Sequence, residues 1–363
     1  MKIALDGACI SPRLTGVGRY FQGLLRELVP LDPAIEYTLF QKDEFDPGLA
    51  FPNLRAKMLP RQGRYFLWQN TLLRNAVNRG GFDFFWSPNY SLPFFLPTPS
   101  ILTVHDISWK SLPDNYSLGN RLYKNLVGDH GFKKARVVFT DSDFSKAEIV
   151  THTSTPENKV KRIHLGVDKS FQRAADGDIS DFKTRYGIAG KRVVGFLGSF
   201  FKRRHVAEVI VAMAIVRQQY PDLALFLVGD NHSLLPGLLN GDPRNVIWRQ
   251  RLPEDEINAF YSSLSLFLYI SAYEGFGLPP MEALSCGTPS LLLRRSSLAE
   301  IYDDLALFID RPDPALIARA ICGFLRQEEE TRRQLLKNWE NRKPYFSWKR
   351  AAEEHLREIR KLR

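Results

Sequence analysis

The chain has 363 residues, 44% of them hydrophobic and 25% charged, which is the composition of a globular protein long enough for two domains. No stretch of about 18 uncharged apolar residues is present, and Asp6 interrupts the apolar start of the chain. We therefore expect neither a transmembrane helix nor an obvious signal peptide. The formal net charge of +10 favours partners that carry phosphate, such as nucleotides, anionic lipids or nucleic acid.

The cysteines Cys9, Cys286 and Cys322 are an odd number, and their spacing is typical neither of a zinc site nor of a disulfide framework. Free thiols in a reducing compartment fit this pattern best. We therefore expect a cytoplasmic protein.

The first half of the chain alternates apolar, β-rich runs with helix-like stretches. The run at 2–7 ends at a glycine, and a loop and the helix-like stretch 20–28 follow it. Similar apolar runs begin the stretches 100–106, 135–150 and 160–168. Strands that alternate with helices predict a parallel, doubly wound sheet.

The alternation starts again after a polar stretch, and we place a domain boundary near 170–180. The last residues, 346–363, have the pattern of a charged amphipathic helix. The sequence thus predicts two α/β domains whose ligands bind at the carboxyl ends of the strands. Within the second half, we expect strands at 192–200, 223–230, 245–250, 266–271 and 289–295 and helices at 205–219, 253–264 and 279–287.

The stretch EGFGLPPMEALSCGTP at 274–289 carries two glutamates around a loop rich in glycine and proline. Pro279 and Pro280 suit the first turn of a helix, and the N–H groups of such a loop and helix start form an anion site. Glu274 and Glu282 could accept hydrogen bonds from sugar or ribose hydroxyls. A solvated glutamate and a glutamate that stabilises the helix dipole would show the same spacing, so the residues alone leave both interpretations open.

This stretch resembles the EGFGLPxxEAMAxGxPV signature of the retaining glycosyltransferases of family 4, and further stretches resemble the family in the same order along most of the chain. The resemblance implies an α/β protein with the GT-B fold, in which two Rossmann-like domains with doubly wound parallel sheets face each other across a cleft. It implies an acceptor-binding domain at 1–172, joined by the C-terminal helix 345–363, which packs back on it. A nucleotide-sugar-binding domain is implied at 173–344.

The resemblance also implies tasks for the residues of this stretch. The glutamate that matches Glu274 acts at the reaction centre, where it binds hydroxyls of the donor sugar. The backbone of Phe276, Gly277 and Leu278 would meet the donor phosphates and sugar. The glutamate that matches Glu282 holds the hydroxyls of the ribose.

The stretch GFLGSFFKRRHVAEVI at 195–210 resembles the family's phosphate clamp, in which an arginine and a lysine neutralise the departing nucleoside diphosphate. Here Ser199 stands in place of the arginine, Arg204 in place of the lysine and His205 in place of a glycine. We expect Arg204 to bind the diphosphate, with Lys202 as the second choice. A solvated, basic start of a helix is the alternative.

Three residues of the N-terminal half complete the expected site. Gly16, in TGVGRY, matches a loop that closes on the donor diphosphate in the family. His105 ends the run SILTVHD and matches a histidine beside the donor sugar at the reaction centre, although a histidine at a strand end is often structural. Asp106 is expected to orient His105 or to meet the acceptor.

The triplet Asp141-Ser142-Asp143 looks like the Asp-x-Asp metal motif of the other glycosyltransferase fold. A helix-like stretch follows it, so Ser142 or Asp143 as a helix N-cap explains the triplet more simply. We expect no cofactor and no required metal.

The segment 61–79 interleaves apolar and aromatic residues with arginines. A basic amphipathic helix of this kind could lie on an anionic membrane surface, which would suit an acceptor carried on a lipid. A helix packed in the core with a solvated basic edge is the alternative, and the sequence does not decide between them.

These features predict a glycosyltransferase that retains the anomeric configuration and moves a hexose from a GDP- or UDP-linked sugar to a glycan or a lipid-linked acceptor. The resemblance is to members that transfer mannose from GDP-mannose in polysaccharide or O-antigen assembly. No carboxylate nucleophile is clearly placed on the acceptor side, which fits a front-face mechanism in which the leaving phosphate takes the proton of the acceptor. We expect a cytoplasmic enzyme, at most peripheral on the inner face of the plasma membrane.

Other functions remain as alternatives. A sugar-nucleotide epimerase or hydrolase would have the same GT-B fold. A basic nucleic-acid-binding protein would share the net charge, but the chain lacks a reading motif, so we expect no nucleic-acid partner. A dinucleotide-dependent dehydrogenase is disfavoured because no GxGxxG follows the first strand.

Overall fold

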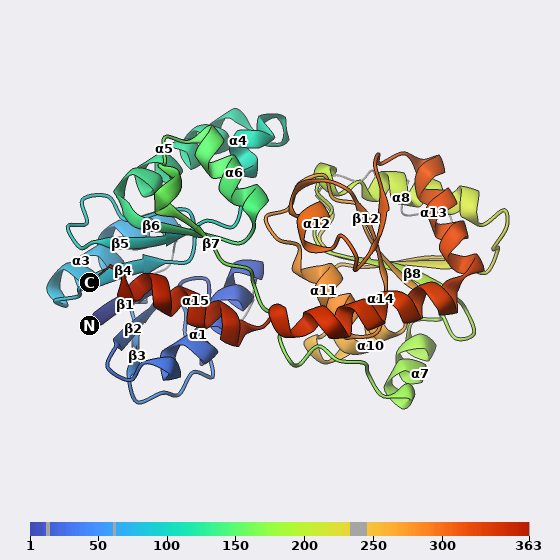
Figure 1. Cartoon of the computed structure of the whole chain (residues 1–363), viewed down its shortest axis with the longest axis horizontal. Helices are drawn as coiled ribbons and strands as arrows, with labels where there is room; N and C mark the ends of the chain where they lie inside the picture. The colour runs from blue at the N-terminus through green and yellow to red at the C-terminus, as the bar shows by residue number, and fades with distance from the viewer. Residues whose placement is uncertain (12–14, 61–62, 233–244, 363) are drawn as a thin grey trace. The chain divides into compact units, whose positions relative to one another are not determined.

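A computed structural model of the whole chain describes residues 1–11, 15–60, 63–232 and 245–362. The chain forms two compact units, which Figure 1 shows with their elements labelled. The first unit consists of Met1–Gly166 and Tyr345–Arg363, and the second of Val167–Pro344. The change of unit falls a few residues before the boundary expected after residue 172. Each unit is described by itself below.

The described part of the first unit is built on a seven-stranded parallel sheet with the order β3-β2-β1-β4-β5-β6-β7. The order reverses between β1 and β4, and in open α/β sheets ligands bind at the carboxyl ends of the strands on either side of such a point. The strands are β1 (Lys2–Asp6), β2 (Glu36–Gln41), β3 (Leu54–Met58), β4 (Phe84–Ser87), β5 (Ser100–Thr103), β6 (Ala135–Thr140) and β7 (Val160–Arg162).

The central strands of this sheet, such as β4 and β5, are buried along their whole length, because helices cover the sheet. Helix α1 (Gly16–Leu31) buries Tyr20, Leu24 and Leu28, which lie four residues apart on one face. The other helices of the unit are α2 (Tyr65–Trp68), η1 (Gln69–Leu73), α3 (Arg74–Arg79), α4 (Ser108–Ser111), η2 (Pro113–Asn115), α5 (Leu118–Lys134), α6 (Asp143–His152), η3 (Glu157–Lys159) and α15 (Trp348–Arg360).

The described part of the second unit holds a six-stranded parallel sheet with the order β10-β9-β8-β11-β12-β13. Here the order reverses between β8 and β11, so the carboxyl ends of these two strands mark the expected binding edge. The strands are β8 (Val193–Leu197), β9 (Ala224–Val228), β10 (Val246–Arg249), β11 (Leu266–Tyr269), β12 (Ser290–Leu293) and β13 (Leu307–Ile309).

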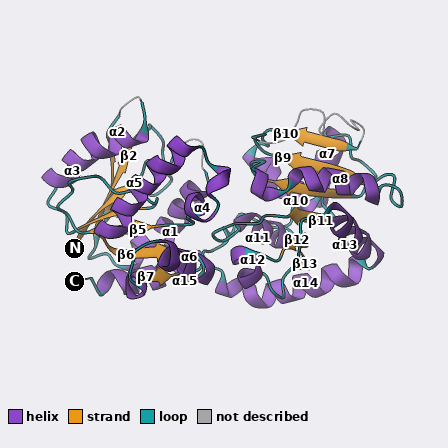
Figure 2. Ribbon diagram, turned by 90° about the horizontal axis from the view of Figure 1, so that it is seen from above, coloured by secondary structure: helices purple, strands orange, loops and turns teal. Residues whose placement is uncertain are grey.

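Helices lie on both sides of the second sheet as well, and Figure 2 shows strands and helices in contrasting colours. The doubly wound α/β fold class expected for both halves is confirmed by the two parallel sheets. The helices are α7 (Asp176–Arg185), η4 (Lys202–Arg204), α8 (Val206–Val216), η5 (Glu254–Glu256), α10 (Ile257–Ser262), α11 (Leu278–Ser285), α12 (Ser296–Ile301), α13 (Pro314–Arg326), α14 (Glu328–Arg342) and η6 (Lys343–Tyr345).

The C-terminal helix α15 packs on α1 in the first unit, as the sequence predicted. Trp348 explains two glycines: a Cβ at Gly23 would lie 2.7 Å from its indole ring, and a Cβ at Gly166 would lie 2.2 Å from its backbone nitrogen. Further along α15, the buried His355 lies 3.3 Å from the hydroxyl of Tyr20 on α1. The end of the chain is therefore part of the core of the first unit.

None of the helices within the described residues combines the length and the apolar character that crossing a bilayer requires.

Candidate active site

The loop after β11 carries Glu274 at the edge of the second sheet where the strand order reverses. The Oγ of Ser271 donates a hydrogen bond of 2.8 Å to the Glu274 carboxylate. The first turn of α12 holds the backbone of Glu274 from the other side: its N–H donates to the Oγ of Ser296 at 3.1 Å, and its carbonyl accepts from the Oγ of Ser297 at 2.8 Å. Glu274 is thus fixed in place before any ligand binds.

Gly277 sets the shape of the loop between the two glutamates. Its φ of +90° lies in the left-handed region, and a Cβ there would lie 2.6 Å from the Cδ2 of Leu298. The hydroxyl of Tyr302 donates to the carbonyl of Gly277, while Pro279 and Pro280 occupy the first turn of α11. Only glycine meets both demands without strain, so the loop reaches the start of α11 in one defined conformation.

The main ion pair of this edge joins Glu274 to Arg204. The Arg204 guanidinium donates from Nε to Oε1 at 2.9 Å and from Nη2 to Oε2 at 3.4 Å, and both side chains are almost buried. Arg204 also donates to the carbonyl of Ser199 at 3.2 Å, so Ser199 contributes its backbone here. The two residues that the resemblance links to the donor sugar and to the diphosphate are therefore partners in one ion pair.

The charges of this pair decide the protonation of Glu274. Burial by itself would raise the pKa of the carboxyl, but the Arg204 and Arg203 guanidinium groups beside it outweigh burial and lower the pKa below its usual value. Glu274 is consequently a carboxylate at neutral pH, able to accept hydrogen bonds and unable to donate a proton.

The basic turn η4 is tied to the Glu274 loop through Arg203, a residue that the sequence analysis left without a task. The N–H of Ala272 donates to the Arg203 carbonyl at 2.8 Å, and the Arg203 Nε donates to the Tyr273 carbonyl at 3.3 Å. Lys202 is exposed in the same turn. The next residue, His205, has a φ of 48°, which explains why the family has a glycine at this position.

Glu282 lies on α11 but is buried, with 4% of its surface exposed. The hydroxyl of Tyr261, on α10, donates to its Oε2 at 2.8 Å. This contact is one that spacing within the motif could not reveal, because Tyr261 lies in a different helix. The expected role of Glu282 as a ribose clamp stays a prediction.

In the first unit, His105 follows β5 and pairs with Asp141, which follows β6. The strands are in register with Thr103 opposite Phe139, so the two side chains leave neighbouring strands at the same level. The Nδ1 of His105 lies 2.7 Å from Oδ2 of Asp141, and because a carboxylate can only accept, Nδ1 carries the hydrogen. The ring also meets the ring of Tyr20 edge-on at 4.6 Å.

The other ring nitrogen of His105, Nε2, is buried and makes no hydrogen bond of good geometry within the part of the chain that the structure describes, although the Pro88 backbone is close enough to raise the pKa of the ring. Burial lowers the pKa of His105, but the Asp141 carboxylate, together with Asp106 and the Pro88 backbone, raises it by more, so that the pKa lies above its usual value. A buried polar atom that is poorly satisfied costs free energy. A ligand hydroxyl that bonded Nε2 would recover this free energy.

Asp106 has a local task next to His105. Its carboxylate accepts from the N–H of Ser108 at 2.8 Å, at the start of α4. Of the two roles expected for it, orienting His105 belongs by geometry to Asp141, which sequence reasoning placed only in the Asp-x-Asp triplet. The register of β5 against β6 was the signal that could have identified Asp141.

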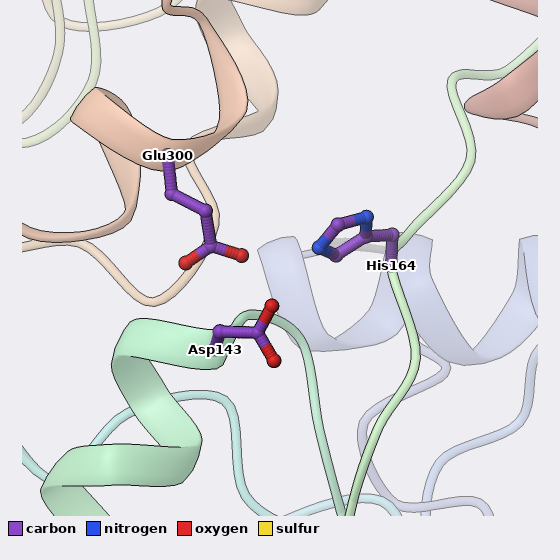
Figure 3. Close-up of side chains that lie close together, drawn as sticks. All are labelled: Asp143, His164 and Glu300. Carbon is purple, nitrogen blue, oxygen red and sulfur yellow. The ribbon is translucent and has the colours of Figure 1, made fainter.

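The remainder of the triplet begins helix α6. Ser142 is its N-cap and accepts from the N–H of Ser145 at 3.1 Å, which confirms the expected cap. Asp143 pairs instead with Arg162 at 3.2 Å. Figure 3 labels Asp143 at the start of α6 and His164 in the segment after β7; the His164 ring lies 5.5 Å from that of Tyr345. The absence of a metal requirement stays a prediction.

Gly16 is the first residue of α1, in the loop after β1. It is exposed, and a Cβ built on it would meet no atom of the described residues within 4 Å. Its backbone conformation does not demand glycine, in contrast to Gly277. The preceding residues 12–14 of the same loop lie outside the described residues.

Comparison with known proteins agrees with this geometry. Residues 14–171 match the family model Glycosyltransferase Family 4, and residues 178–342 match Glycosyl transferases group 1. The O-antigen chain mannosyltransferase B of Escherichia coli is 26% identical over 349 residues, covering 90% of this chain and 91% of that protein.

Two solved structures share the fold over almost the whole chain. The sucrose-phosphate synthase of Thermosynechococcus elongatus has a TM-score of 0.79 at 19% identity, covering 99% of this chain and 98% of that one. HepE of Anabaena, in complex with UDP and glucose, has a TM-score of 0.77 at 17% identity, covering 99% and 100%. Together with the family models that match both units, they show that the chain has the GT-B fold and is a glycosyltransferase with a group 1 domain in its second unit.

Proposed function

We propose that this glycosyltransferase transfers mannose from GDP-mannose to a glycan or a lipid-linked saccharide in the synthesis of a cell-surface polysaccharide, with retention of the anomeric configuration. The similarity to an O-antigen mannosyltransferase along nine tenths of the chain supports the sugar and the pathway. The observation that carries the enzymatic part is the Arg204–Glu274 pair at the binding edge of the second sheet.

In this proposal the second unit binds the donor. The backbone of Phe276, Gly277 and Leu278, held in its defined conformation, offers N–H groups to the diphosphate and the sugar. Glu274 accepts from the sugar hydroxyls, and Glu282 holds the ribose. No cofactor and no metal takes part.

Arg204 supplies the positive charge that the departing diphosphate needs as the glycosidic bond breaks, with Lys202 of the same turn as a further cation. Because the clamp arginine of the family is Ser199 in this chain, Arg204 carries a larger share of this work. A diphosphate that competes with Glu274 for the guanidinium would loosen the ion pair. The release of Glu274 then frees its oxygens for sugar hydroxyls.

The first unit binds the acceptor, and Gly16 permits the loop after β1 to approach the diphosphate. The Nε2 of His105 bonds a substrate hydroxyl, while Asp141 keeps the ring in the tautomer that leaves Nε2 available. The acceptor's proton goes to the leaving phosphate, as in a front-face mechanism, so that the protein supplies positioning and electrostatics. The enzyme would act in the cytoplasm, at the inner face of the plasma membrane.

Radiolabelled GDP-mannose, UDP-glucose and related donors, incubated with and without a lipid-linked saccharide, test the proposal. Transfer of label from GDP-mannose to the acceptor is expected. Formation of an epimer or of free sugar, with no labelled acceptor, would identify an epimerase or hydrolase instead. A thermal-shift series with GDP and UDP sugars separates the choice of base from that of acceptor, because the correct donor stabilises the folded protein.

A further inference from the structure

Helix α5 presents a row of leucines that no described part of the chain covers. Leu118, Leu122 and Leu126 are 62%, 58% and 62% exposed. Residues four apart lie within about 80° of one another over these two turns of a helix, so the three form one stripe. The opposite face of α5 is buried through Val127 and Phe132. The helix is therefore apolar on both sides, which packing within the protein does not require.

The leucine row continues onto neighbouring segments. On the helix itself, Tyr123 is 40% exposed. Its ring lies 5.8 Å from the ring of Phe66 in α2, which in turn lies 6.1 Å from that of Phe94 in the loop before β5. The neighbours of these two residues, Leu67 and Phe95, are 46% and 85% exposed. We call the set of exposed residues the α5 patch: Leu67, Phe95, Leu118, Leu122, Tyr123 and Leu126.

Phe95 is held in a conformation that points to a partner. Its φ is 56°, a left-handed conformation that is costly for a bulky side chain. The side chain gains almost no contact in return, since it is the most exposed large hydrophobic residue in the described part of the chain. Strain that the protein's own contacts do not repay is typical of segments that act in binding.

Cations surround the patch. Lys133 falls on the same side of α5 as the leucine row, Lys134 is exposed beside it, and Arg64 is exposed at the start of α2. The acidic residue of α5, Asp129, falls on this side and is paired with Lys110 at 2.9 Å, while Asp114 is exposed in the turn before the helix. The patch thus combines exposed apolar side chains with a positive rim.

We propose that the α5 patch docks the protein on an anionic lipid bilayer, with the leucines at the acyl boundary and the cations among the headgroups. This inference rests on the proposed function, because a lipid-linked acceptor would lie in such a bilayer. The patch also lies on the connection that leaves His105 at the end of β5 and runs through α4 into α5. Binding here would hold the acceptor-binding unit at the membrane.

The α5 patch is not the surface that the sequence suggested for membrane binding, which was the segment 61–79. The segment 61–79 turns its apolar face into the core: Trp68 and Leu73 are fully buried, and the Trp68 indole donates to the Leu59 carbonyl at 2.7 Å. The structure therefore supports the core-packed interpretation for most of this segment, and Leu67 is its contribution to the patch. Arg61 and Gln62 lie outside the described residues.

A second copy of the chain is a poorer occupant than a bilayer. A closed dimer uses the same surface on both subunits, so it would bring the cationic rim of one copy against that of the other. Like charges at such an interface oppose association. Anionic headgroups complement the same rim.

Co-sedimentation with vesicles tests the inference on the full chain. The double variant Leu122→Gln/Leu126→Gln should lower the partition onto phosphatidylglycerol-containing vesicles by about tenfold or more for the pair. Phe95→Gly should weaken binding without loss of thermal stability, because glycine adopts a positive φ freely. Lys133→Gln/Lys134→Gln should weaken binding to anionic vesicles, and added salt should weaken binding of the unchanged protein.

The matched control is Val211→Gln/Ile215→Gln on α8, where the two side chains are 45% and 41% exposed; it should bind vesicles normally. The inference is overturned if the unchanged chain does not bind anionic vesicles, or if the α5 and α8 variants bind equally. It is also overturned if ultracentrifugation shows a dimer that only the α5 variant dissociates and vesicles are not bound. Transfer of mannose to a soluble glycan should be the same in all these variants, and its absence would count against the proposed function alone.

Discussion

At the scale of single residues, one ion pair positions the charged side chains at the binding edge of the second unit. Glu274 and Arg204 form an ion pair at 2.9 Å, so neither is a buried, unpaired charge. The pair also prepares the site for a donor, because both partners are held near the position where the proposed function needs them. Replacing one residue of the pair should therefore change turnover and GDP affinity to different extents.

We predict that Glu274→Ala lowers kcat by about 100-fold or more and leaves the Kd for GDP unchanged or lower. The reason is that the variant frees the Arg204 guanidinium from its partner, while sugar hydroxyls lose an acceptor. Initial rates and calorimetric titration of GDP measure the two effects, with Glu274→Gln as the variant that keeps the side chain's size. Equal loss of turnover and GDP affinity would show that the two residues do not divide the work.

Asp141 is the residue-scale feature of the first unit. We predict that Asp141→Asn lowers the pKa of His105, because this carboxylate is the largest of the contributions that raise the pKa against the effect of burial. A histidine whose pKa is raised by folding stabilises the fold below its unfolded pKa, near 6.5, and this stabilisation is lost as the pH rises through the folded pKa. The stability difference between the unchanged chain and the variant should therefore be largest below about pH 6.5.

Thermal unfolding of both proteins between acid and mildly alkaline pH provides the comparison, with Asp143→Asn as the matched control on the same turn. A difference in stability that is constant across this range would mean that Asp141 acts on folding without acting on the charge of His105.

The sequence pointed to residues that the structure places just after strands or at the start of a helix, but it did not reveal their contacts. The motif pointed to Glu274 and Glu282, and the end of a β-rich run pointed to His105. Asp141 and Tyr261 were missed because their contacts depend on how β6 lies against β5 and how α10 lies against α11. Such contacts follow from tertiary register, which local spacing does not contain.

At the scale of elements, the loops that begin α1 and α11 use glycine for different reasons. Gly277 is required by its positive φ and by the nearness of Leu298, whereas a Cβ on Gly16 would meet no described atom within 4 Å. A glycine demanded by the fold and a glycine that serves a ligand should respond differently to the same substitution.

We predict that Gly277→Ala destabilises the protein by about 2 kcal/mol or more, from left-handed strain and the contact with Leu298. Gly16→Ala should leave the melting temperature unchanged and still reduce kcat/KM, because the added methyl group would lie where the loop approaches the diphosphate. Differential scanning calorimetry and initial rates separate the two. Normal activity of Gly16→Ala would remove that loop from the donor site.

The elements expected in the second half are largely observed, but others were not recognised, among them the buried strand β4 and the amphipathic helix α13. The helix expected at 279–287 is observed as α11, Leu278–Ser285, and both domains show the expected parallel sheets. The strand β3 was not recognised because it lies at the edge of its sheet with mostly exposed residues, among them Arg55 and Lys57. Some of the basic residues behind the net charge of +10 thus lie on an exposed edge strand, where charged side chains oppose pairing with another chain.

At the scale of the whole molecule, the chain completes its first unit only with its last residues. Trp348 fits against two glycines, and Arg360 pairs with Asp32 at 2.8 Å. The second unit, Val167–Pro344, consists of one continuous segment of the chain. The stability of the first unit therefore depends on helix α15, which lies far along the chain from the rest of that unit.

We predict that Trp348→Ala destabilises the first unit by about 3 kcal/mol or more, as removal of a buried aromatic ring does, and leaves the second unit unaffected. Hydrogen exchange followed by mass spectrometry should show reduced protection in α1 and β1 and unchanged protection in β8 and β11. GDP binding, which the second unit provides in the proposed function, should persist. Uniform loss of protection in both units would mean that they do not fold independently.

The central claim is that this glycosyltransferase moves mannose from GDP-mannose with retention of configuration. Its most direct test is the reaction of GDP-mannose with a lipid-linked or soluble glycan acceptor, followed by NMR of the purified product. The one-bond coupling constant between C1 and H1 should show an α-linked mannose, the configuration of the donor. A β-linked product, or release of mannose without a glycan product, would contradict the account.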